Sequence, residues 1–182
     1  MNLPLKHMTA EEFAAWAEAQ ELGRYELIDG VVVEMNAETS NHAVVKFNVA
    51  VALREALKRS GLKGRVYTDG MAVKIADRVV HEPDALLRLG EPLPGNAVLV
   101  TDPFIVVEVL SPSTGPVDTG AKLVNYFKLP SVTHYLVVNT AKKVVLHYFR
   151  GAEGPPELKV VEGGAIDFEH AGLSLNLTGV FE

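Results

Sequence analysis

The chain has 182 residues, 48% of them hydrophobic, and a formal net charge of −6. This length fits one domain, residues 1–182, and this composition supports a buried core, so extensive disorder is excluded. The negative charge argues against a protein that coats nucleic acid non-specifically, because such proteins carry a basic footprint. It leaves room for an enzyme with a local acidic metal site. The absence of cysteine excludes disulfides, thiolate zinc sites and cysteine nucleophiles.

The sequence gives no sign of membrane insertion or export. No apolar run reaches the roughly 18 residues that a membrane-spanning helix needs. Residues 1–20 are acidic and amphipathic, without a basic segment leading into an apolar stretch, so we expect no secretory signal. A cytoplasmic protein without membrane contact is therefore expected.

The N-terminal part of the chain predicts a helix followed by a β-hairpin. Thr9 and Glu12 have the spacing of a capping box, and the helix should run to about residue 20. Asp29-Gly30 between two β-rich segments is typical of a tight hairpin turn. The two strands are expected at Tyr25–Ile28 and at residues 31–35.

The remainder of the chain predicts a mixed α/β protein with many short strands. A broad apolar face predicts a long helix over Ser40–Ser60, which Gly61 ends. A loop over residues 111–116 and a helix over residues 119–129 follow a central strand. The expected strands are residues 65–68, 72–75, Val79–His81, 84–89, 104–110, 133–139, Val144–Phe149 and 158–161, before a short C-terminal piece.

Glu108 and Asp84 are the clearest candidates for a functional site. Glu108 lies in an otherwise apolar strand, and a carboxylate buried there must be paired, protonated or bound to a metal. Asp84 follows Pro83 and opens another apolar segment. Acids near the ends of neighbouring strands can hold Mg²⁺ or Mn²⁺ through oxygen ligands. The alternatives are a salt bridge from Glu108 to a buried Arg or Lys, and a turn-capping role for Asp84.

Lys122 and Glu26 extend this candidate site. Lys122 falls in the helix after the strand of Glu108, with Tyr126 one turn later on the same face. A lysine beside a metal can orient the attacking water and neutralise charge on the phosphate, although most lysines are solvated surface residues. Glu26 either faces a cleft or is an exposed strand residue.

Two histidines are weaker candidates. His42, near the start of the long helix, could contact metal or phosphate, but a capping or surface role is the favoured interpretation. His81 has no second histidine at a recognisable metal-ligand spacing.

An ordered series of motifs spans nearly the whole chain. It comprises residues 8–13, residues 25–30, Pro83-Asp84, residues 107–114, Asp118 with Lys122 and Tyr126, and residues 134–138. With this series the chain resembles the PD-(D/E)XK nuclease superfamily, and within it a bacterial branch of restriction-endonuclease-like proteins. The resemblance implies an α+β fold with a central mixed β-sheet flanked by helices, preceded by an N-terminal helix and β-hairpin.

The same resemblance implies that Asp84 and Glu108 are metal ligands and that Glu26 is an active-site residue. The superfamily lysine normally stands two residues after the second acid, where this chain has Leu110. The branch moves its lysine into the next helix, which makes Lys122 the candidate for that role.

The expected function is that of a metal-dependent endonuclease acting on nucleic acid, with DNA favoured. Mg²⁺ or Mn²⁺ held by Asp84 and Glu108 would activate water, which Lys122 would position, and Glu26 would bind the metal directly or through water. One alternative is a catalytically inactive module that binds nucleic acid or protein. Another is a structural homo-oligomer in which the strands Val144–Phe149 and 158–161 pair between subunits.

Overall fold

The structure is a computed structural model that describes residues 6–110, 116–168 and 171–182. Its helices are α1 (Ala10–Glu18), α2 (Ser40–Ser60) and α3 (Pro116–Tyr126). Its strands are β1 (Tyr25–Ile28), β2 (Val31–Glu34), β3 (Gly64–Thr68), β4 (Ala72–Ala76), β5 (Val79–His81), β6 (Ala85–Leu89), β7 (Leu99–Val100), β8 (Ile105–Leu110), β9 (His134–Asn139), β10 (Val144–Phe149), β11 (Glu157–Val161), β12 (Ala165–Phe168) and β13 (Leu173–Asn176).

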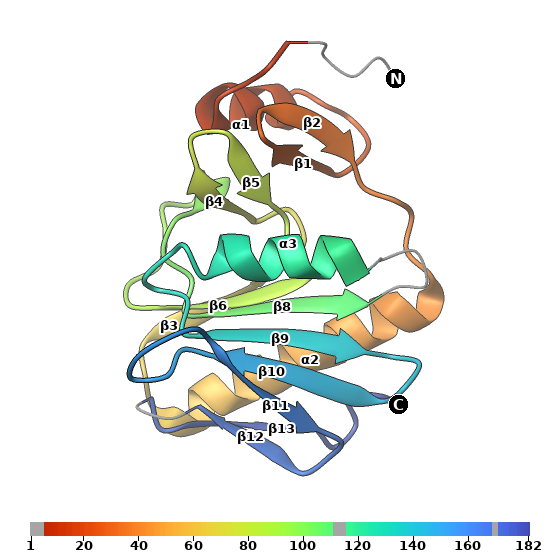
Figure 1. Ribbon diagram of the computed structural model, residues 1–182, viewed down its shortest axis with the longest axis vertical. Coiled ribbons are helices and arrows are strands. Elements are labelled where there is room, and N and C mark those ends of the chain that lie inside the picture. Colours follow the sequence, from red (N-terminus) through yellow and green to blue (C-terminus); the bar gives the residue numbers. More distant parts are fainter. Residues whose placement is uncertain (1–5, 111–115, 169–170) are drawn as a thin grey trace.

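A six-stranded mixed sheet lies at the centre, in the order β11-β10-β9-β8-β6-β3 (Figure 1). Strands β8 and β9 run parallel, and the other neighbouring pairs run antiparallel. Helix α2 covers one face and α3 the other (Figure 1). The predicted central mixed sheet flanked by helices is confirmed.

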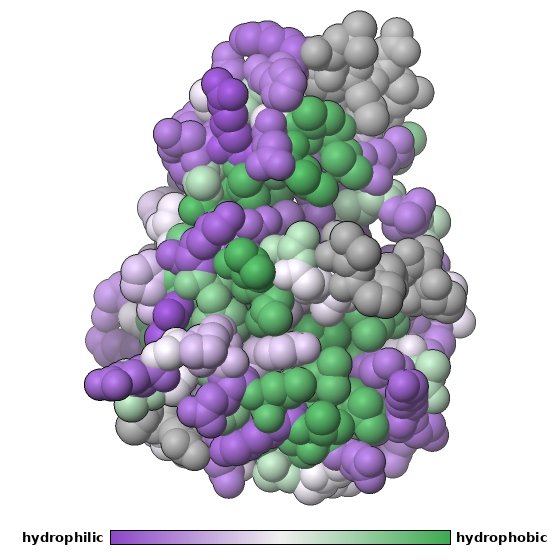
Figure 2. Space-filling view, viewed as in Figure 1, coloured by the Kyte–Doolittle hydropathy of each residue, from purple (hydrophilic) through white to green (hydrophobic). Residues whose placement is uncertain are grey.

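Strand β11 forms one edge of this sheet. Its side chains Leu158 and Val160 are 50% and 58% exposed. Figure 2 shows apolar side chains gathered in the lower half of the drawn face, over the end of the sheet that holds β10 and β11. An unpaired strand edge of this kind can accept another strand.

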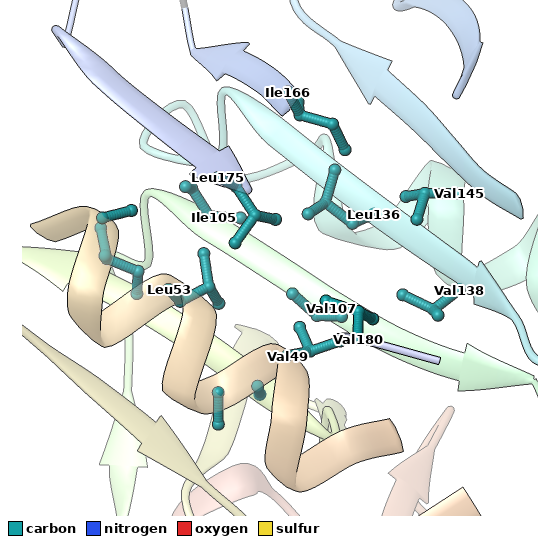
Figure 3. Close-up of a cluster of buried hydrophobic side chains, with 14 of the residues drawn as sticks. Val49, Leu53, Ile105, Val107, Leu136, Val138, Val145, Ile166, Leu175 and Val180 are labelled. Atoms are coloured by element: carbon teal, nitrogen blue, oxygen red, sulfur yellow. The ribbon is translucent and has the colours of Figure 1, made fainter. Parts of the chain in front are cut away.

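The largest buried cluster lies between α2 and the central sheet. Val49 and Leu53 of α2 pack on Ile105 and Val107 of β8 (Figure 3). Side chains of the β12–β13 hairpin, among them Leu175, close the same cluster (Figure 3). Full burial of each such aliphatic side chain stabilises the fold by roughly 1.5–3 kcal/mol. This core fixes the face of β8 that points away from α2, and Glu108 lies on that face.

The N-terminal layer is a second sheet, in the order β2-β1-β5-β4-β7, covered by α1 (Figure 1). The capping box of Thr9 and Glu12 is present, as predicted. Asp29 and Gly30 both have positive φ, 50° and 85°, which is the conformation of a type I′ hairpin turn. Alternation along β1 directs Leu27 towards α1 and leaves Glu26 on the opposite face.

Most predicted elements are present, with three differences. Helix α3 spans Pro116–Tyr126 instead of residues 119–129, and proline is favoured at a first helical position. Strand β7 has only two residues, too few for a recognisable pattern. The predicted short C-terminal piece contains the hairpin β12–β13. Residues 111–115 of the predicted loop lie outside the described residues. In the described part of the chain, no helix combines the length and apolar character needed to cross a bilayer.

Candidate active site

The pairing of β6 with β8 brings Asp84 and Glu108 together. Ala85 lies opposite Val107 in this antiparallel pair, so continuing the register by one residue brings Asp84 level with Glu108. The backbone N–H of Val109 donates a hydrogen bond of 2.6 Å to Oδ2 of Asp84. The two acids that the sequence pointed to therefore lie at one position of the sheet.

A cavity of about 200 Å³ lies between the central sheet, α3 and the β1–β2 hairpin, and all four predicted site residues line it. Its polar and charged lining residues are Arg24, Glu26, Glu34, Asn36, Glu38, His42, Asp84, Glu108 and Lys122. A larger cavity of about 410 Å³ lies on the α1 side and is lined by none of the four. The smaller cavity is the candidate site, because it holds the converging charges.

Lys122 lies between two of the acids. Its Nζ is 3.0 Å from Oε1 of Glu26 and 3.2 Å from Oε1 of Glu108. The hydroxyl of Tyr126, one helical turn later, donates a hydrogen bond of 2.8 Å to Oε1 of Glu108. Burial of Lys122 and Glu26 rules out the surface roles left open for them, and the salt bridge considered for Glu108 is present.

The two glutamates differ in acidity although they share Lys122. Burial raises the pKa of Glu108 to about 7; the negative charges of Asp84 and Glu26 add to the effect, whereas Lys122 and Tyr126 oppose it. For Glu26, burial also acts to raise the pKa, but the hydrogen bond to His81 and the charge of Lys122 prevail and lower it to about 2. At neutral pH, Glu26 is the permanently ionised partner of Lys122.

Glu26 has further partners at the end of β5. The backbone N–H of Glu82 donates a 2.9 Å hydrogen bond to Oε1 of Glu26. His81 Nδ1 lies 3.5 Å from Oε2 of Glu26, and its Nε2 lies 2.9 Å from the side-chain amide of Asn125. His81 thus links Glu26 to Asn125 of α3.

The favoured interpretation of His42 as a cap or surface residue is wrong. Thr39 caps α2, and His42 is only 6% exposed. Its Nε2 lies 2.8 Å from the carbonyl oxygen of Val109 and 3.4 Å from Oδ2 of Asp84. The pKa of His42 is raised by its hydrogen bond to Asp84, although burial opposes the shift.

Sequence reasoning also missed a charged network beside the site. Lys46 lies 2.6 Å from Oε1 of Glu38 and 2.7 Å from Oδ2 of Asp69, and Arg24 also pairs with Glu38. The signal that could have found part of this network is the spacing of four that places His42 and Lys46 on one face of α2, with Glu38 just before the N-cap Thr39.

The cavity carries an excess of negative charge. Five acidic side chains line it, against the two basic ones of Arg24 and Lys122. Among the described residues, one group of three side chains offers ligand atoms within 4.8 Å of one another, and it consists of Glu38, His42 and Asp84. An arrangement of carboxylates with one lysine can hold a divalent cation and orient a phosphate beside it.

Comparison with known proteins places the chain in a family. The profile of the Uma2 family, "Putative restriction endonuclease", matches residues 10–178. The chain belongs to the Uma2 family. Uma2 membership assigns it to proteins of nuclease type, in agreement with the superfamily resemblance of the sequence.

Two curated relatives of this Uma2 protein come from Synechocystis sp. One, "Uncharacterized protein slr1290", is 26% identical over 154 residues, which are 84% of this chain and 80% of the relative. The other, "Uncharacterized protein sll1609", is 27% identical over 146 residues, which are 79% of this chain and 81% of the relative.

A solved structure has the same fold as this Uma2 protein. It is a crystal structure of "a putative nuclease belonging to DUF820" from Anabaena variabilis, with a TM-score of 0.73 and 16% sequence identity. The match covers 96% of this chain and 97% of the other. The restriction-endonuclease-like fold expected from the sequence is confirmed.

Proposed function

We propose that this Uma2 protein is a metal-dependent endonuclease that hydrolyses phosphodiester bonds of nucleic acid, DNA above all. The observation that supports the proposal is the convergence of one lysine and three acids from distant parts of the chain on a single cavity. Lys122 lies 3.2 Å from Glu108, although the position two residues after that acid is Leu110. A lysine in contact with the second acid fits a nuclease that has moved this residue to the following helix.

The donor set of the cavity fits a divalent cation. Asp84 and Glu108 offer carboxylate oxygens at one level of the sheet, and oxygen ligands suit Mg²⁺ and Mn²⁺. The pKa of Glu108 is raised partly by the charges of Asp84 and Glu26, and a cation would relieve that repulsion. Glu26 would reach the cation directly or through a water. When bound, the cation would stabilise negative charge on the reacting phosphate and make a nearby water more acidic.

Lys122 has the role of positioning the attacking water and the phosphate. Its ammonium group has three donors, and two of them are directed to Glu26 and Glu108. The hydrogen bond from Tyr126 to Glu108 and the backbone bond from Glu82 to Glu26 fix both carboxylates around it. The amine is thus held in place before substrate arrives, which is the preorganisation that electrostatic catalysis requires.

Plasmid nicking with Mn²⁺ tests this function. Asp84→Asn and Lys122→Met should each abolish nicking while circular dichroism and the elution volume stay those of the wild type. Asp167→Asn, at an exposed position of β12 far from the cavity, is the matched control and should nick normally. Undiminished nicking by both site variants would reject the assignment.

A second candidate is a non-catalytic module that binds nucleic acid or protein. The net charge of −6 and the displacement of the lysine from the position of Leu110 to α3 favour it. In that case the wild type would bind oligonucleotides or a protein partner without cleaving any substrate at millimolar Mn²⁺. Substrate cleavage that is lost in Asp84→Asn decides for the enzyme.

Self-association through β11 is a further part of the proposal. Leu158 and Val160 of this edge strand are exposed, and a second copy could extend the sheet there. Light scattering should then give the mass of a dimer, and Val160→Lys should return the mass of one chain. A wild type that scatters as one chain at high concentration would refute this contact.

A further inference from the structure

His42 is held in a single orientation by the strand that carries Glu108. Its ring is buried beside β8, and Nε2 lies 2.8 Å from the carbonyl oxygen of Val109. A carbonyl oxygen only accepts hydrogen bonds, so Nε2 carries the hydrogen. In the neutral ring, Nδ1 therefore presents a lone pair.

That lone pair lacks a hydrogen-bonding partner within the described part of the chain, and the atom is buried. The nearest acidic atom is Oε2 of Glu38, at 3.4 Å, which is also an acceptor. Two acceptors that face each other repel unless a proton or a cation lies between them. Nδ1 is thus the atom of His42 that is directed at a ligand position.

Asp84 lies beside the same ring. One ligand atom from each of Glu38, His42 and Asp84 lies within 4.8 Å of those from the other two, and Oδ2 of Asp84 is 3.4 Å from Nε2 of His42. The peptide groups of Val109 hold two of the three side chains, since its N–H donates to Asp84 and its carbonyl accepts from His42. A metal-ligating histidine commonly donates its second ring N–H to a backbone carbonyl or a carboxylate in this manner.

Glu38 can turn to a cation without leaving its present partners unpaired. Lys46 also contacts Asp69, at 2.7 Å. Arg24 also contacts Asp69 and Glu82, at 3.3 and 3.4 Å. Both basic residues therefore keep an acidic partner when an oxygen of Glu38 moves to a ligand.

We propose that Glu38, His42 and Asp84 form a second cation position, which binds first-row transition ions such as Mn²⁺ or Co²⁺ in preference to Mg²⁺. The imidazole nitrogen is the basis of this selectivity, because imidazole suits transition ions whereas Mg²⁺ prefers oxygen ligands. The inference rests on the proposed function through Asp84 alone, which contributes to both positions. Glu108 belongs to the first position and is not a member of the compact group.

The test is pulsed electron paramagnetic resonance of the full chain with Mn²⁺, together with a calorimetric titration. The wild type should show modulation from a directly coordinated ¹⁴N nucleus, and an excess of Mg²⁺ should not remove it. His42→Gln should abolish the modulation and weaken Mn²⁺ binding at one of two sites by at least about tenfold. His7→Gln, an exposed histidine at the hairpin, is the control and should behave as the wild type.

Two further variants make the outcome decisive. Glu38→Gln, at a position whose side chain is 20% exposed, should weaken the same site even if His42→Gln fails to fold. Glu108→Gln should leave the nitrogen modulation intact while the other site is lost. Modulation that is absent from the wild type, or that persists in His42→Gln, would overturn the second position. If Glu108→Gln loses nicking and the wild type shows no nitrogen modulation, the nuclease function stands and the second cation position is refuted. If the wild type shows nitrogen modulation but Asp84→Asn nicks as well as the wild type, the second position stands and the nuclease assignment is refuted.

Discussion

The ammonium nitrogen of Lys122 lies 3.0 Å from Oε1 of Glu26, and this ion pair connects the two sheets of the protein. Glu26 is on β1 of the N-terminal sheet, whereas Lys122 is on the helix that covers the central sheet. Both residues are only 6% exposed. Each charged group is therefore stabilised by the other instead of by water.

Lys122→Met should destabilise the fold as well as abolish nicking. The change leaves Glu26 and Glu108 buried without their shared counter-ion, and breaking a buried pair costs about 3–5 kcal/mol. Urea unfolding at neutral pH measures the loss. Lys128→Met, at an exposed position just beyond α3, should leave the midpoint unchanged. Equal midpoints for both variants would contradict the role of Lys122 as counter-ion.

The stability of the metal-free protein should depend on pH in opposite senses through Glu26 and Glu108. The pKa of Glu26 is lowered to about 2, so its contribution is complete above pH 4.5 and is lost as the pH falls from 4.5 towards 2. The pKa of Glu108 is raised to about 7, so the folded protein holds this proton more tightly than the unfolded chain, and stability falls as the pH rises from 4.5 to 7.

Urea midpoints with a chelator present test this sign. Glu108→Gln should become more stable relative to the wild type as the pH rises from 4.5 to about 7, because glutamine removes the ionisation. Glu26→Gln should lose stability relative to the wild type as the pH rises from about 2 to 4.5. If the difference in urea midpoint between the wild type and Glu108→Gln is constant from pH 4.5 to about 7, the pKa of Glu108 is not raised.

Tyr126→Phe removes the hydroxyl that donates a hydrogen bond to Glu108 but keeps the buried ring. It therefore separates the effect of this hydrogen bond from the effect of packing. The lost hydrogen bond to a carboxylate should cost about 1.5–3 kcal/mol, measured by urea unfolding above the pKa of Glu108. Because the hydroxyl opposes the rise of that pKa, the pH profile of nicking should move to higher pH. Tyr67→Phe on the edge strand β3 is the control. An unchanged profile would exclude Tyr126 from this role.

The core beneath α2 should respond to truncation much more than the outer face of the same helix. Leu53 is fully buried in the main cluster, so Leu53→Ala should lower the free energy of unfolding by about 2–5 kcal/mol. Phe47 is 67% exposed, so Phe47→Ala should change it by no more than about 0.5 kcal/mol. Similar losses in thermal or urea unfolding would mean that the outer face is covered by a partner.

Much of the fold could be predicted because its signals are local. The capping box, the Asp-Gly turn and the apolar run of β8 each act within a few residues, and all three are present. Strand β7 and the C-terminal hairpin could not be recognised in this way. The two residues of β7 pair with β4, and the β12–β13 strands are held by contacts with the cluster on α2.

Site residues could be predicted only where the signal came from residues nearby in the sequence. An acid in an apolar strand must have a partner, which identified Glu108, and the helical spacing joined Lys122 to Tyr126. The burial of His42 depends on how α2 approaches Val109, which is a tertiary contact between residues far apart in sequence. The contacts of Arg24 and Lys46 with Asp69 were missed for the same reason.

The ion pair between Glu26 of the N-terminal sheet and Lys122 of α3 has a consequence during biosynthesis. The ribosome releases the hairpin that holds Glu26 first, but the amine that neutralises it follows only after β8 has emerged. Until then this carboxylate must stay in water, because burying it alone is too unfavourable. The cavity therefore closes late, once about two-thirds of the polypeptide has been made, and a chain that ends before Lys122 cannot form it.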